Sequence, residues 1–408
     1  MMIGSQSKPL LYLFIFSLFL LKSYSQDKVD AADIETKTLE LYTNKNWNSL
    51  ISLGNDALKN GTDYFYLRMR LGIAYYEQKN YCSAEEHFAK AIEFNDTDDL
   101  AKEYLYYSNL FVGKEEEARK LSSSFSSELK EKLGLDKIAL IDFISVNGGA
   151  KMANDAFSDS SNPIYFEPAR FFELGLKHYY KNKFSLFHTL STFSQETFIG
   201  KINQNQYYAL STIPLKNNWS IAPAFHAVQL NFTGRIPGFN SDKTTNNYFV
   251  GSFSVHKSFK KFDFSIGSTY SSILNITQYN HFGNVTYSVF GNSQLILGIT
   301  NYVHTIDSYA KVNNSFSAFV HFEPLKFVTL KFTYIKNQNN NIIEENGYFV
   351  NNSTDLTTNR FGVLANFRIN KTFSLSTLYQ IENKELFLQN SNYQYSILLT
   401  GLKINNPF

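Results

Sequence analysis

The sequence of 408 residues has little cysteine and few long apolar runs, and each shortage excludes a class of protein. The single cysteine, Cys82, excludes a disulfide framework and a CxxC metal or redox motif, and we expect it to be a buried apolar residue. No stretch after Ser25 approaches the 18 consecutive apolar residues of a membrane-spanning helix. The formal charge of +2 indicates neither a nucleic-acid partner nor an acidic tail.

Motifs for catalysis and metal binding are also missing. Seven of the eight histidines follow residue 138, and none has the spacing of HExxH or of another metal-ligand motif. There is no GxSxG element and no glycine-rich phosphate loop. A barrel hydrolase with a Ser–His pair placed by the fold is a remote alternative. We therefore expect no catalytic residue, no metal and no cofactor.

Aromatic residues are abundant, with 38 Phe and 27 Tyr, yet the mean hydropathy is only −0.26. Many aromatics beside many polar residues do not suit a bundle of membrane helices, which needs long apolar segments. They suit strands that face lipid on one side and water on the other. The composition thus favours a β-barrel.

Segment 1–25 has the features of a secretory signal peptide. Lys8 precedes the apolar run Pro9–Leu21, and the small residues Ser23 and Ser25 then offer a cleavage site before Gln26. The alternative is an uncleaved anchor helix, but the run is short for a bilayer span. No cysteine follows it for lipid attachment. The segment therefore predicts export to the periplasm.

A fixed period of about 34 residues marks segment 26–136, and such a period is typical of a helical repeat. Trp47 and Tyr81 are one period apart, and so are Ala57 and Ala91. The central unit carries the pattern Leu71-Gly72, Tyr75, Tyr81, Ala84, Phe88 and Ala91. This pattern resembles the tetratricopeptide (TPR) family, and the resemblance implies about three helical hairpins stacked as an α-solenoid.

The resemblance also implies a concave face formed by the first helix of each hairpin. Such a face is a candidate site for a periplasmic protein or polymer. Its members would be Tyr66, Met69, Ile73, Tyr76, Glu77, Glu103, Tyr107 and Phe111. The alternative is that some of these side chains pack against a neighbouring helix or the rim of the barrel.

From residue 137 to 408 the hydrophobic period changes to two. Segment Val328–Lys336 alternates apolar Val328, Leu330 and Phe332 with Thr329 and Lys331, and similar segments recur about fourteen times. The strands are long for a soluble sandwich and long enough to cross a bilayer at a tilt. The sequence thus predicts a multi-domain α + all-β chain: a short TPR solenoid, then an antiparallel transmembrane β-barrel of about 14 strands (12–16).

The links between the predicted strands alternate in length. Tight links follow the even strands, and longer links follow the odd ones, the longest being Ala153–Glu167, Thr233–Thr245 and Gln338–Leu356. Outer-membrane barrels have short periplasmic turns and long outer loops. The helical segment would therefore lie in the periplasm, beside an outer membrane whose lipid surrounds the barrel. The last strand, which ends at Phe408, resembles the signal read by outer-membrane assembly machinery.

Charged and imidazole side chains fall on the predicted inward faces. The lumen candidates are Glu173, Lys177, His256, Asp263, His321, Lys331, Arg368 and Glu382. Both signs are present, so no strong ion selectivity is expected. The pattern does not distinguish a water-filled lumen from one plugged by a loop.

The layout of a TPR segment joined to an outer-membrane barrel is similar to that of exopolysaccharide-export porins, although those have many more repeats. The similarity implies a pore or export component of the cell envelope. The alternative is a non-conducting anchor that docks a periplasmic partner of an envelope or secretion complex. A lipid- or sugar-modifying enzyme is the remote third reading.

Overall fold

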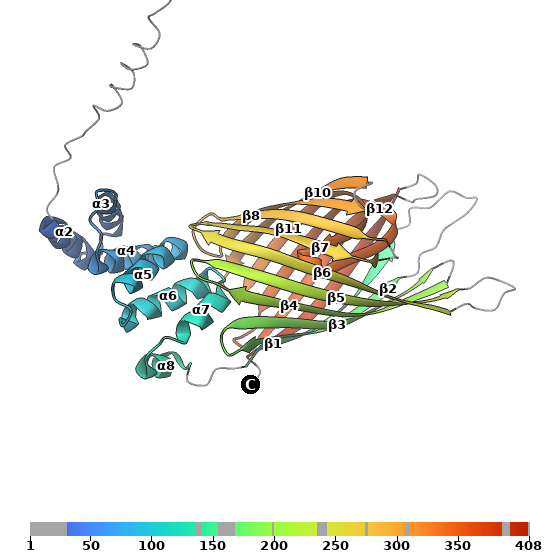
Figure 1. Ribbon diagram of the computed structural model, residues 1–408, viewed down its shortest axis with the longest axis horizontal. Helices are drawn as coiled ribbons and strands as arrows, with labels where there is room; N and C mark the ends of the chain where they lie inside the picture. The colour runs from blue at the N-terminus through green and yellow to red at the C-terminus, as the bar shows by residue number, and fades with distance from the viewer. Residues whose placement is uncertain are drawn as a thin grey trace, which may run out of the picture.

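The computed structural model describes residues 31–135, 140–153, 168–197, 200–234, 243–273, 276–306, 311–385 and 392–406. It shows a group of helices placed at one end of a closed barrel (Figure 1). The predicted signal peptide and Phe408 lie outside the described residues. No helix among the described ones is long and apolar enough to cross a membrane.

Seven α-helices among the described residues form three hairpins and a short last helix. They are α2 (Ala31–Thr43), α3 (Trp47–Lys59), α4 (Phe65–Glu77), α5 (Tyr81–Phe94), α6 (Asp99–Phe111), α7 (Glu115–Ser122) and α8 (Ser127–Leu133). Each hairpin begins one sequence period after the previous one, in its first helix and in its second. The sequence period is therefore a structural period.

The turn inside each hairpin repeats as well. Lys45, Lys79 and Gly113 have φ values of 54°, 59° and 79°, and each stands one period from the next. A left-handed residue after a helix ends it by redirecting its backbone. Asn46 and Asn80 then cap the second helices, where each side chain accepts a hydrogen bond from the backbone N–H three residues on.

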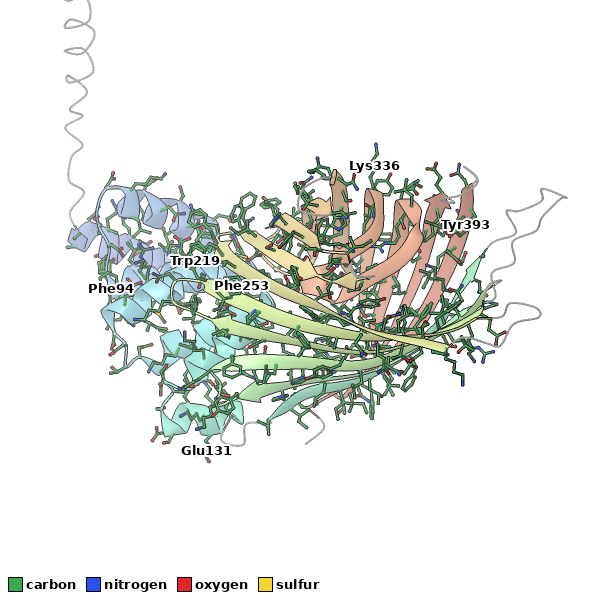
Figure 2. All side chains as sticks on the ribbon, turned by 45° about the vertical axis from the view of Figure 1, so that its right-hand side comes forward. Phe94, Glu131, Trp219, Phe253, Lys336 and Tyr393 are labelled. Carbon is green, nitrogen blue, oxygen red and sulfur yellow. The ribbon has the colours of Figure 1, made fainter. Side chains whose placement is uncertain are left out.

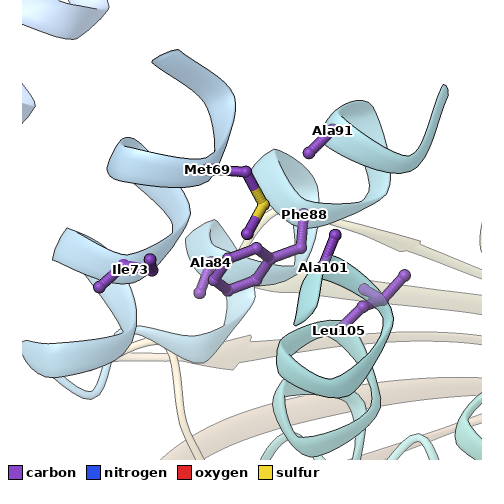
Figure 3. Close-up of a cluster of buried hydrophobic side chains, with 7 residues drawn as sticks. All are labelled: Met69, Ile73, Ala84, Phe88, Ala91, Ala101 and Leu105. Carbon is purple, nitrogen blue, oxygen red and sulfur yellow. The ribbon is translucent and has the colours of Figure 1, made fainter. Parts of the chain in front are cut away.

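The hairpins bury their apolar faces against one another. Figure 3 shows the central cluster, in which Phe88 of α5 lies among side chains of α4 and α6. Gly72 permits this packing, because a methyl group added there would lie 2.6 Å from the Phe88 ring. Ala84 and Phe88 are fully buried, so these residues of the repeat pattern form the core of the helical module.

Fourteen antiparallel strands close into a barrel in which β1 pairs with β14. The strands are β1 (Ile141–Ala153), β2 (Ala169–Tyr180), β3 (Phe184–Thr197), β4 (Gly200–Pro214), β5 (Trp219–Gly234), β6 (Lys243–Phe259), β7 (Phe262–Ser271), β8 (Gln278–Ser288), β9 (Leu295–Ile306), β10 (Lys311–Leu325), β11 (Val328–Glu344), β12 (Phe349–Arg368), β13 (Phe373–Glu385) and β14 (Asn392–Asn405). The predicted α + all-β layout and the strand number are confirmed.

The outward face of the barrel is apolar and exposed. Every strand except β8 presents at least one exposed large apolar side chain there, and Ile266 reaches 68% exposure. Figure 2 shows Phe253 on the barrel wall, Trp219 near the helices, and Lys336 and Tyr393 near the opposite end. The alternation continues around the wall, so the outward surface is a nearly unbroken apolar belt.

The links that follow the even-numbered strands are short, and they lie at the end that carries the helices. Two of them, at Lys181-Asn182 and Asn217-Asn218, have two successive residues with positive φ. This is the geometry of a type I′ turn, which suits the twist of a tight β-hairpin. The last strand also ends there, at Asn405, so helices, short turns and the end of β14 share one rim (Figure 1).

One predicted outer loop is not a loop. The sequence predicts that Gln338–Leu356 links two strands outside the barrel, but β11 continues to Glu344 and β12 starts at Phe349. Glu345, Asn346 and Gly347 all have positive φ, which makes the tight reversal between them possible. The prediction was wrong here because a tight turn let the two strands extend.

The link between β3 and β4 is also shorter than predicted. The alternation predicts that these strands end at residue 195 and begin at 204, but Thr197 pairs with Gly200. Gly200 has a φ of 152° and lies close to the backbone of Thr233, so a side chain there would clash. The regular alternation of short and long links therefore fails at this hairpin.

Candidate functional site: the barrel lumen and its two closures

The barrel encloses a cavity of about 1180 Å³. Of the residues predicted to face the lumen, Glu173, His256, Lys331 and Glu382 line this cavity. The others lie nearer the rim with the short turns and outside the cavity lining: Lys177, Asp263, His321 and Arg368. The structure thus divides the predicted set between a central chamber and a mouth.

A hairpin of the wall closes the chamber from the end opposite the helices. This inward hairpin, residues 343–350, comprises the end of β11, the 3-10 turn η2 (Glu345–Gly347) and the start of β12. The turn lies against β5, β6 and β7, on the other side of the lumen. Ile343 packs there against Tyr248 and Val250. The lumen is therefore obstructed by the barrel's own chain.

Polar contacts from three strands hold the inward hairpin. The Tyr348 hydroxyl donates to the Glu173 carboxylate at 2.7–2.8 Å. The Nδ1 of His226 is 2.8 Å from the carbonyl oxygen of Gly347, and the hydroxyl of Tyr208 donates to the carbonyl of Asn346 at 3.4 Å. Because β2, β4 and β5 all contribute, the turn is attached across the lumen.

Ion pairs secure the base of the inward hairpin. Arg360 of β12 pairs with Glu344, and its guanidinium lies 4.5 Å from the centre of the Phe349 ring. Arg360 and Glu344 are both buried. A buried charge that loses its partner is costly, so these pairs favour the folded-in position of the hairpin.

A second charged group follows on the neighbouring strands. Glu382 of β13 accepts a hydrogen bond from Lys151 at 2.8 Å, and its other oxygen lies 3.7 Å from Lys384. Lys384 and Glu382 are both almost fully buried. Cations and carboxylates thus alternate around the wall beside the inward hairpin.

An apolar strip lies inside the chamber, on the helix side of these charges. Leu364, Leu378 and Leu399 face one another directly on β12, β13 and β14. The strip continues on β2 and β3 through Phe171 and Phe193, which are also opposite each other. All five line the cavity. We call them the apolar arc; they give the lumen one wall on which a partly apolar solute can lie.

Strand β14 departs from the pattern of its neighbours. Its most apolar positions, Tyr393, Tyr395, Ile397 and Leu399, face the lumen, whereas Val328–Lys336 directs its apolar side chains outward. Leu398, on the outward face of β14, is exposed. Alternation alone does not tell which face of a strand points outward. For β14 the structure shows that the more apolar face points into the lumen.

A serine–histidine pair is present in the barrel, but it does not form a hydrolytic site. Ser254 Oγ and His256 Nε2 lie 2.8 Å apart, two residues along β6. Ser254 is fully buried, so a substrate in the lumen cannot reach its hydroxyl. Among the described residues no group of three His, Cys, Asp or Glu side chains could hold a metal ion.

Helix α7 lies over the mouth at the short-turn rim. Glu116 accepts a hydrogen bond from Ser185 at 2.8 Å and pairs with Lys177 at 3.0 Å. The guanidinium of Arg119 lies 3.7 Å from the centre of the Tyr179 ring. These partners belong to β2 and β3, so the last helical hairpin is attached to one side of the mouth.

The second helical hairpin is attached elsewhere on the rim. The backbone N–H of Cys82 donates to the carbonyl of Gly291 at 3.0 Å, and Asn292 donates to the carbonyl of Lys79. Glu85 links the two attachments, since it pairs with Lys114 and accepts from Asn218 at 2.8 Å. The helical module therefore contacts several separate turns and has a fixed position on the rim.

Burial sets the ionisation of two groups in the helical module. It raises the pKa of the Cys82 thiol to about 11, so the thiol stays neutral at physiological pH, as expected of a packing residue. It lowers the pKa of His87 to about 4, and Arg68 beside the ring acts in the same direction. Neither group is placed as a catalyst.

The predicted concave face is only partly open. Tyr66 is 61% exposed and Phe111 is also exposed, but Met69 and Ile73 lie in the hydrophobic core of Figure 3. They fill the space between hairpins and cannot contact a ligand. Glu103 is engaged in an ion pair with Lys132 of α8.

The remaining members of that face belong to an aromatic cluster. Tyr76 lies 5.0 Å from Tyr104 and 5.1 Å from Tyr81, measured between ring centres. Phe111 stacks at 6.2 Å on Tyr107. Burial raises the pKa of Tyr76 to about 12. The face is thus built of rings that pack on each other, beside Glu77, with Tyr66 projecting from it.

Sequence reasoning missed the residues that hold the inward hairpin. It assigned Tyr348 and Phe349 to an outer loop and did not single out Glu344 and Arg360. Two acidic residues next to Asn346 and Gly347 in an apolar-polar alternation are the one signal of a tight buried turn. The other aromatic residues of predicted outer loops, Tyr165, Phe166 and Phe239, lie outside the described residues.

Comparison with solved structures finds bacterial outer-membrane barrels of low sequence identity. A FadL homologue from Pseudomonas aeruginosa is 10% identical, with a TM-score of 0.42 over 65% of this chain and 90% of that one. The toluene transporter TbuX of Ralstonia pickettii is 6% identical, with 0.45 over 65% and 89%. The KdgM porin is 11% identical, with 0.30 over 64% and 98%.

No model of a known protein family matches the sequence, and no curated protein does. The similar structures agree with this chain in being barrels, and they assign it no substrate. The function has to be argued from the lumen itself.

Proposed function

We propose that this chain is an outer-membrane transport protein whose barrel conducts a solute through a lumen gated by the inward hairpin. The observation that carries the proposal is the contrast between the two faces of the wall. The outward face exposes apolar side chains on thirteen strands, whereas the inward face encloses a charged cavity of about 1180 Å³. A soluble protein would not leave so large an apolar surface in water.

The strands have the dimensions of a membrane barrel. They contain 10 to 20 residues, and about 9–11 tilted residues suffice to cross the hydrocarbon layer. Because the sheet closes on itself, every strand finds a partner on both sides, and no backbone group has to face lipid without a hydrogen bond. These properties support a bilayer-spanning barrel.

The orientation follows from the position of the helices. Short turns face the periplasm in outer-membrane barrels, and the helical module shares a rim with the short turns here. The helical module then lies in the periplasm, and the inward hairpin enters the lumen from the cell surface. The regular repeat of the helical hairpins supports membership of the TPR class, whose members bind partner proteins.

The closed lumen implies a resting state that conducts little. The inward hairpin is attached to the opposite wall mainly by Tyr348, His226 and Tyr208. Loss of a few hydrogen bonds is within the energy that ligand binding supplies, since each contributes about 0.5–3 kcal/mol. The apolar arc then suits a solute that is at least partly apolar.

A second candidate function is that of an anchor that docks a periplasmic partner. The multiple attachments of the helical module favour it, because a rigid mount at the rim presents Tyr66 and Phe111 in a defined place. In that case the inward hairpin is a permanent plug. The two functions differ in whether the lumen ever opens.

Planar-bilayer recordings separate these functions. We expect the purified protein to show rare, brief openings, and a variant with residues 343–350 replaced by a short glycine-serine link to show a steady current. Insertion is checked independently by the heat-dependent shift of folded barrels in gel electrophoresis. If the shortened variant is inserted but carries no current, transport through the lumen is refuted and the anchor function stands.

A further inference from the structure

The two ends of the barrel differ in charge. The six short turns contain no Asp or Glu and carry Lys181, Lys183, Lys216, Lys260, Lys261, Lys326 and Lys371. In the sequence, the links at the opposite end contain one basic residue, Arg235, and six acidic residues: Asp155, Asp159, Glu167, Asp242, Asp307 and Glu345. A net charge of +2 for the whole chain hides this separation.

Six of the turn lysines are exposed. Lys261 is the exception, since its ammonium group donates to the carbonyl of Val289 at 3.0 Å. The exposed six form what we call the lysine collar: Lys181, Lys183, Lys216, Lys260, Lys326 and Lys371. They come from five of the six turns, so the collar runs around most of the rim.

Exposed aromatic rings accompany the collar on the outward face. Tyr180, Phe259 and Phe327 each directly precede or follow a collar lysine and are exposed. Lys181 lies 5.5 Å from the ring centre of Tyr180, and Lys260 lies 5.4 Å from that of Phe259. Aromatic rings in such belts mark the head-group level of a bilayer. The lysines therefore lie at the depth of lipid phosphates.

The acids near this rim do not neutralise the collar. Asp263 and Glu323 are on the inward faces of their strands, where they contact Thr286 and His321. Glu115 and Glu116 of α7 are paired with Lys177 in the mouth. The outward side of the rim is left with positive charge.

A polar patch interrupts the apolar belt next to the collar. His178 and His188, on the outward faces of β2 and β3, approach to 3.2 Å between their Nε2 atoms, and the Tyr207 hydroxyl is 2.8 Å from His188 Nδ1. His178 is three residues from Lys181 in the chain. Imidazole and hydroxyl groups bind phosphate oxygens, whereas they gain nothing from acyl chains. This sector has the chemistry of a head-group site.

We propose that the lysine collar binds the phosphate groups of anionic phospholipids in the periplasmic leaflet and so surrounds the rim with anionic lipid. The inference rests on the proposed membrane location and orientation. Exposed lysines at a bilayer surface attract anionic lipid, and each contributes about fivefold to the local preference at low salt. The collar also holds the barrel at a fixed depth beneath the helical module.

Full-length protein in nanodiscs tests the collar. The discs contain phosphatidylcholine with a minor fraction of phosphatidylglycerol, and native mass spectrometry measures which lipid the released barrel retains. We expect phosphatidylglycerol to be enriched over the bulk ratio. The triple variant Lys181→Gln, Lys216→Gln, Lys260→Gln is expected to lower the enrichment at least about fivefold.

A triple variant of equal charge change serves as the control. Lys201, Lys243 and Lys336 are exposed lysines on the outward face near the opposite end. Changing all three to Gln is expected to leave the enrichment unchanged. No enrichment in the wild type, or the same loss in both triple variants, overturns the proposal. The proposal is also overturned if the preference for phosphatidylglycerol is unchanged in both triple variants.

The outcome also separates this inference from the function on which it rests. Protein that fails to enter nanodiscs in folded form refutes the membrane location and the collar together. Protein that inserts and shows no preference refutes the collar alone. Added salt should reduce the enrichment, because exposed charges are screened over about 8–10 Å at physiological salt.

Discussion

The barrel is obstructed at its two ends by different means. At the short-turn rim a separate helical module is attached through ion pairs such as Glu115–Lys177, in which the Glu115 side chain is half exposed. At the other end the wall's own hairpin enters the lumen and is held by buried pairs such as Glu344–Arg360. The first closure covers one side of a mouth, and the second crosses the chamber.

Because the ion pairs differ in burial, they also differ in strength. Exposed ion pairs contribute about 0–1 kcal/mol and weaken in salt, whereas disrupting a buried pair costs several kcal/mol. Ion pairs such as Glu115–Lys177 are therefore individually weak, whereas the Glu344–Arg360 pair at the base of the inward hairpin is strong. Five changes test this comparison, from the largest expected effect to the smallest.

Arg360→Met should have the largest effect. It leaves Glu344 buried without its partner, which costs about 3–5 kcal/mol. We expect the urea midpoint of barrel unfolding to fall markedly. Arg368→Gln, at an exposed position on the same strand, provides the control and should change the midpoint little. If Arg360→Met leaves the midpoint unchanged, the pair does not hold the hairpin.

Acid should unfold the helical module before the barrel. The pKa of His87 is lowered from 6.5 to about 4 by burial, so the folded module favours the neutral ring. Stability is complete above pH 6.5 and falls as the pH drops towards 4, by up to about 3 kcal/mol. Arg68 and Arg70 hold the pKa values of Asp63 and Glu35 below their ordinary values. The stability that these two carboxylates contribute is therefore lost only below about pH 4.5.

Trp47 fluorescence follows this transition in a Trp219→Phe background, since these are the only two tryptophans. His87→Phe keeps an aromatic ring against Tyr75, on which His87 stacks at 5.3 Å. It should remove the pH dependence between 6.5 and 4. A transition that persists unchanged in this variant would assign the effect to another group.

Gly72→Ala should weaken the helical module by about 1–3 kcal/mol, because the added methyl group meets the Phe88 ring at 2.6 Å. Thermal unfolding monitored at Trp47 measures the loss. The double variant Gly72→Ala, Phe88→Leu supplies room for the methyl group and should recover part of it. Equal stability of Gly72→Ala and the wild type would contradict the close packing of α4 and α5.

Tyr348→Phe should loosen the inward hairpin without unfolding the barrel. It removes a hydrogen bond to a charged acceptor, worth about 1.5 kcal/mol or more. The fraction of time that the lumen conducts should rise about tenfold in single-channel recordings. Tyr334→Phe, on the outward face of β11, is the control for a lost hydroxyl. Equal open times in both variants would show that Tyr348 does not restrain the hairpin.

Glu116→Gln should have the smallest effect. It weakens the contacts with Lys177 and Ser185, but Lys177 keeps its pairs with Glu115 and Asp142, so only about 1 kcal/mol is expected. Limited proteolysis of the helical module should become faster, and high salt should produce the same change in the wild type. Glu117→Gln should not accelerate it, because no hydrogen bond or ion pair joins Glu117 to the barrel among the described residues.

The same comparison explains which parts of the fold the sequence could predict. The helical hairpins follow from a fixed sequence period, and most strand limits follow from alternation, because both are local patterns. The inward hairpin is not local: Tyr348 meets Glu173 across the lumen, 175 residues away. No sequence period records such a contact.

The candidate site was predicted in the same uneven way. The strand period placed Glu173 and Glu382 among the inward residues, and both line the cavity. Their partners Tyr348 and Lys151 depend on how the turn at Asn346 folds and on the register of β1 against β14. For Met69 and Ile73 the family resemblance suggested an open face, whereas the neighbouring hairpin covers them.

The central claim is that the inward hairpin gates the lumen, and a reversible disulfide tests it most directly. A Cβ at Gly347 would lie 3.7 Å from that of Ser252, within the range of a disulfide. In a Cys82→Ser background, Gly347→Cys with Ser252→Cys should be silent in planar bilayers when oxidised and should open after reduction. Equal currents before and after reduction would contradict the account.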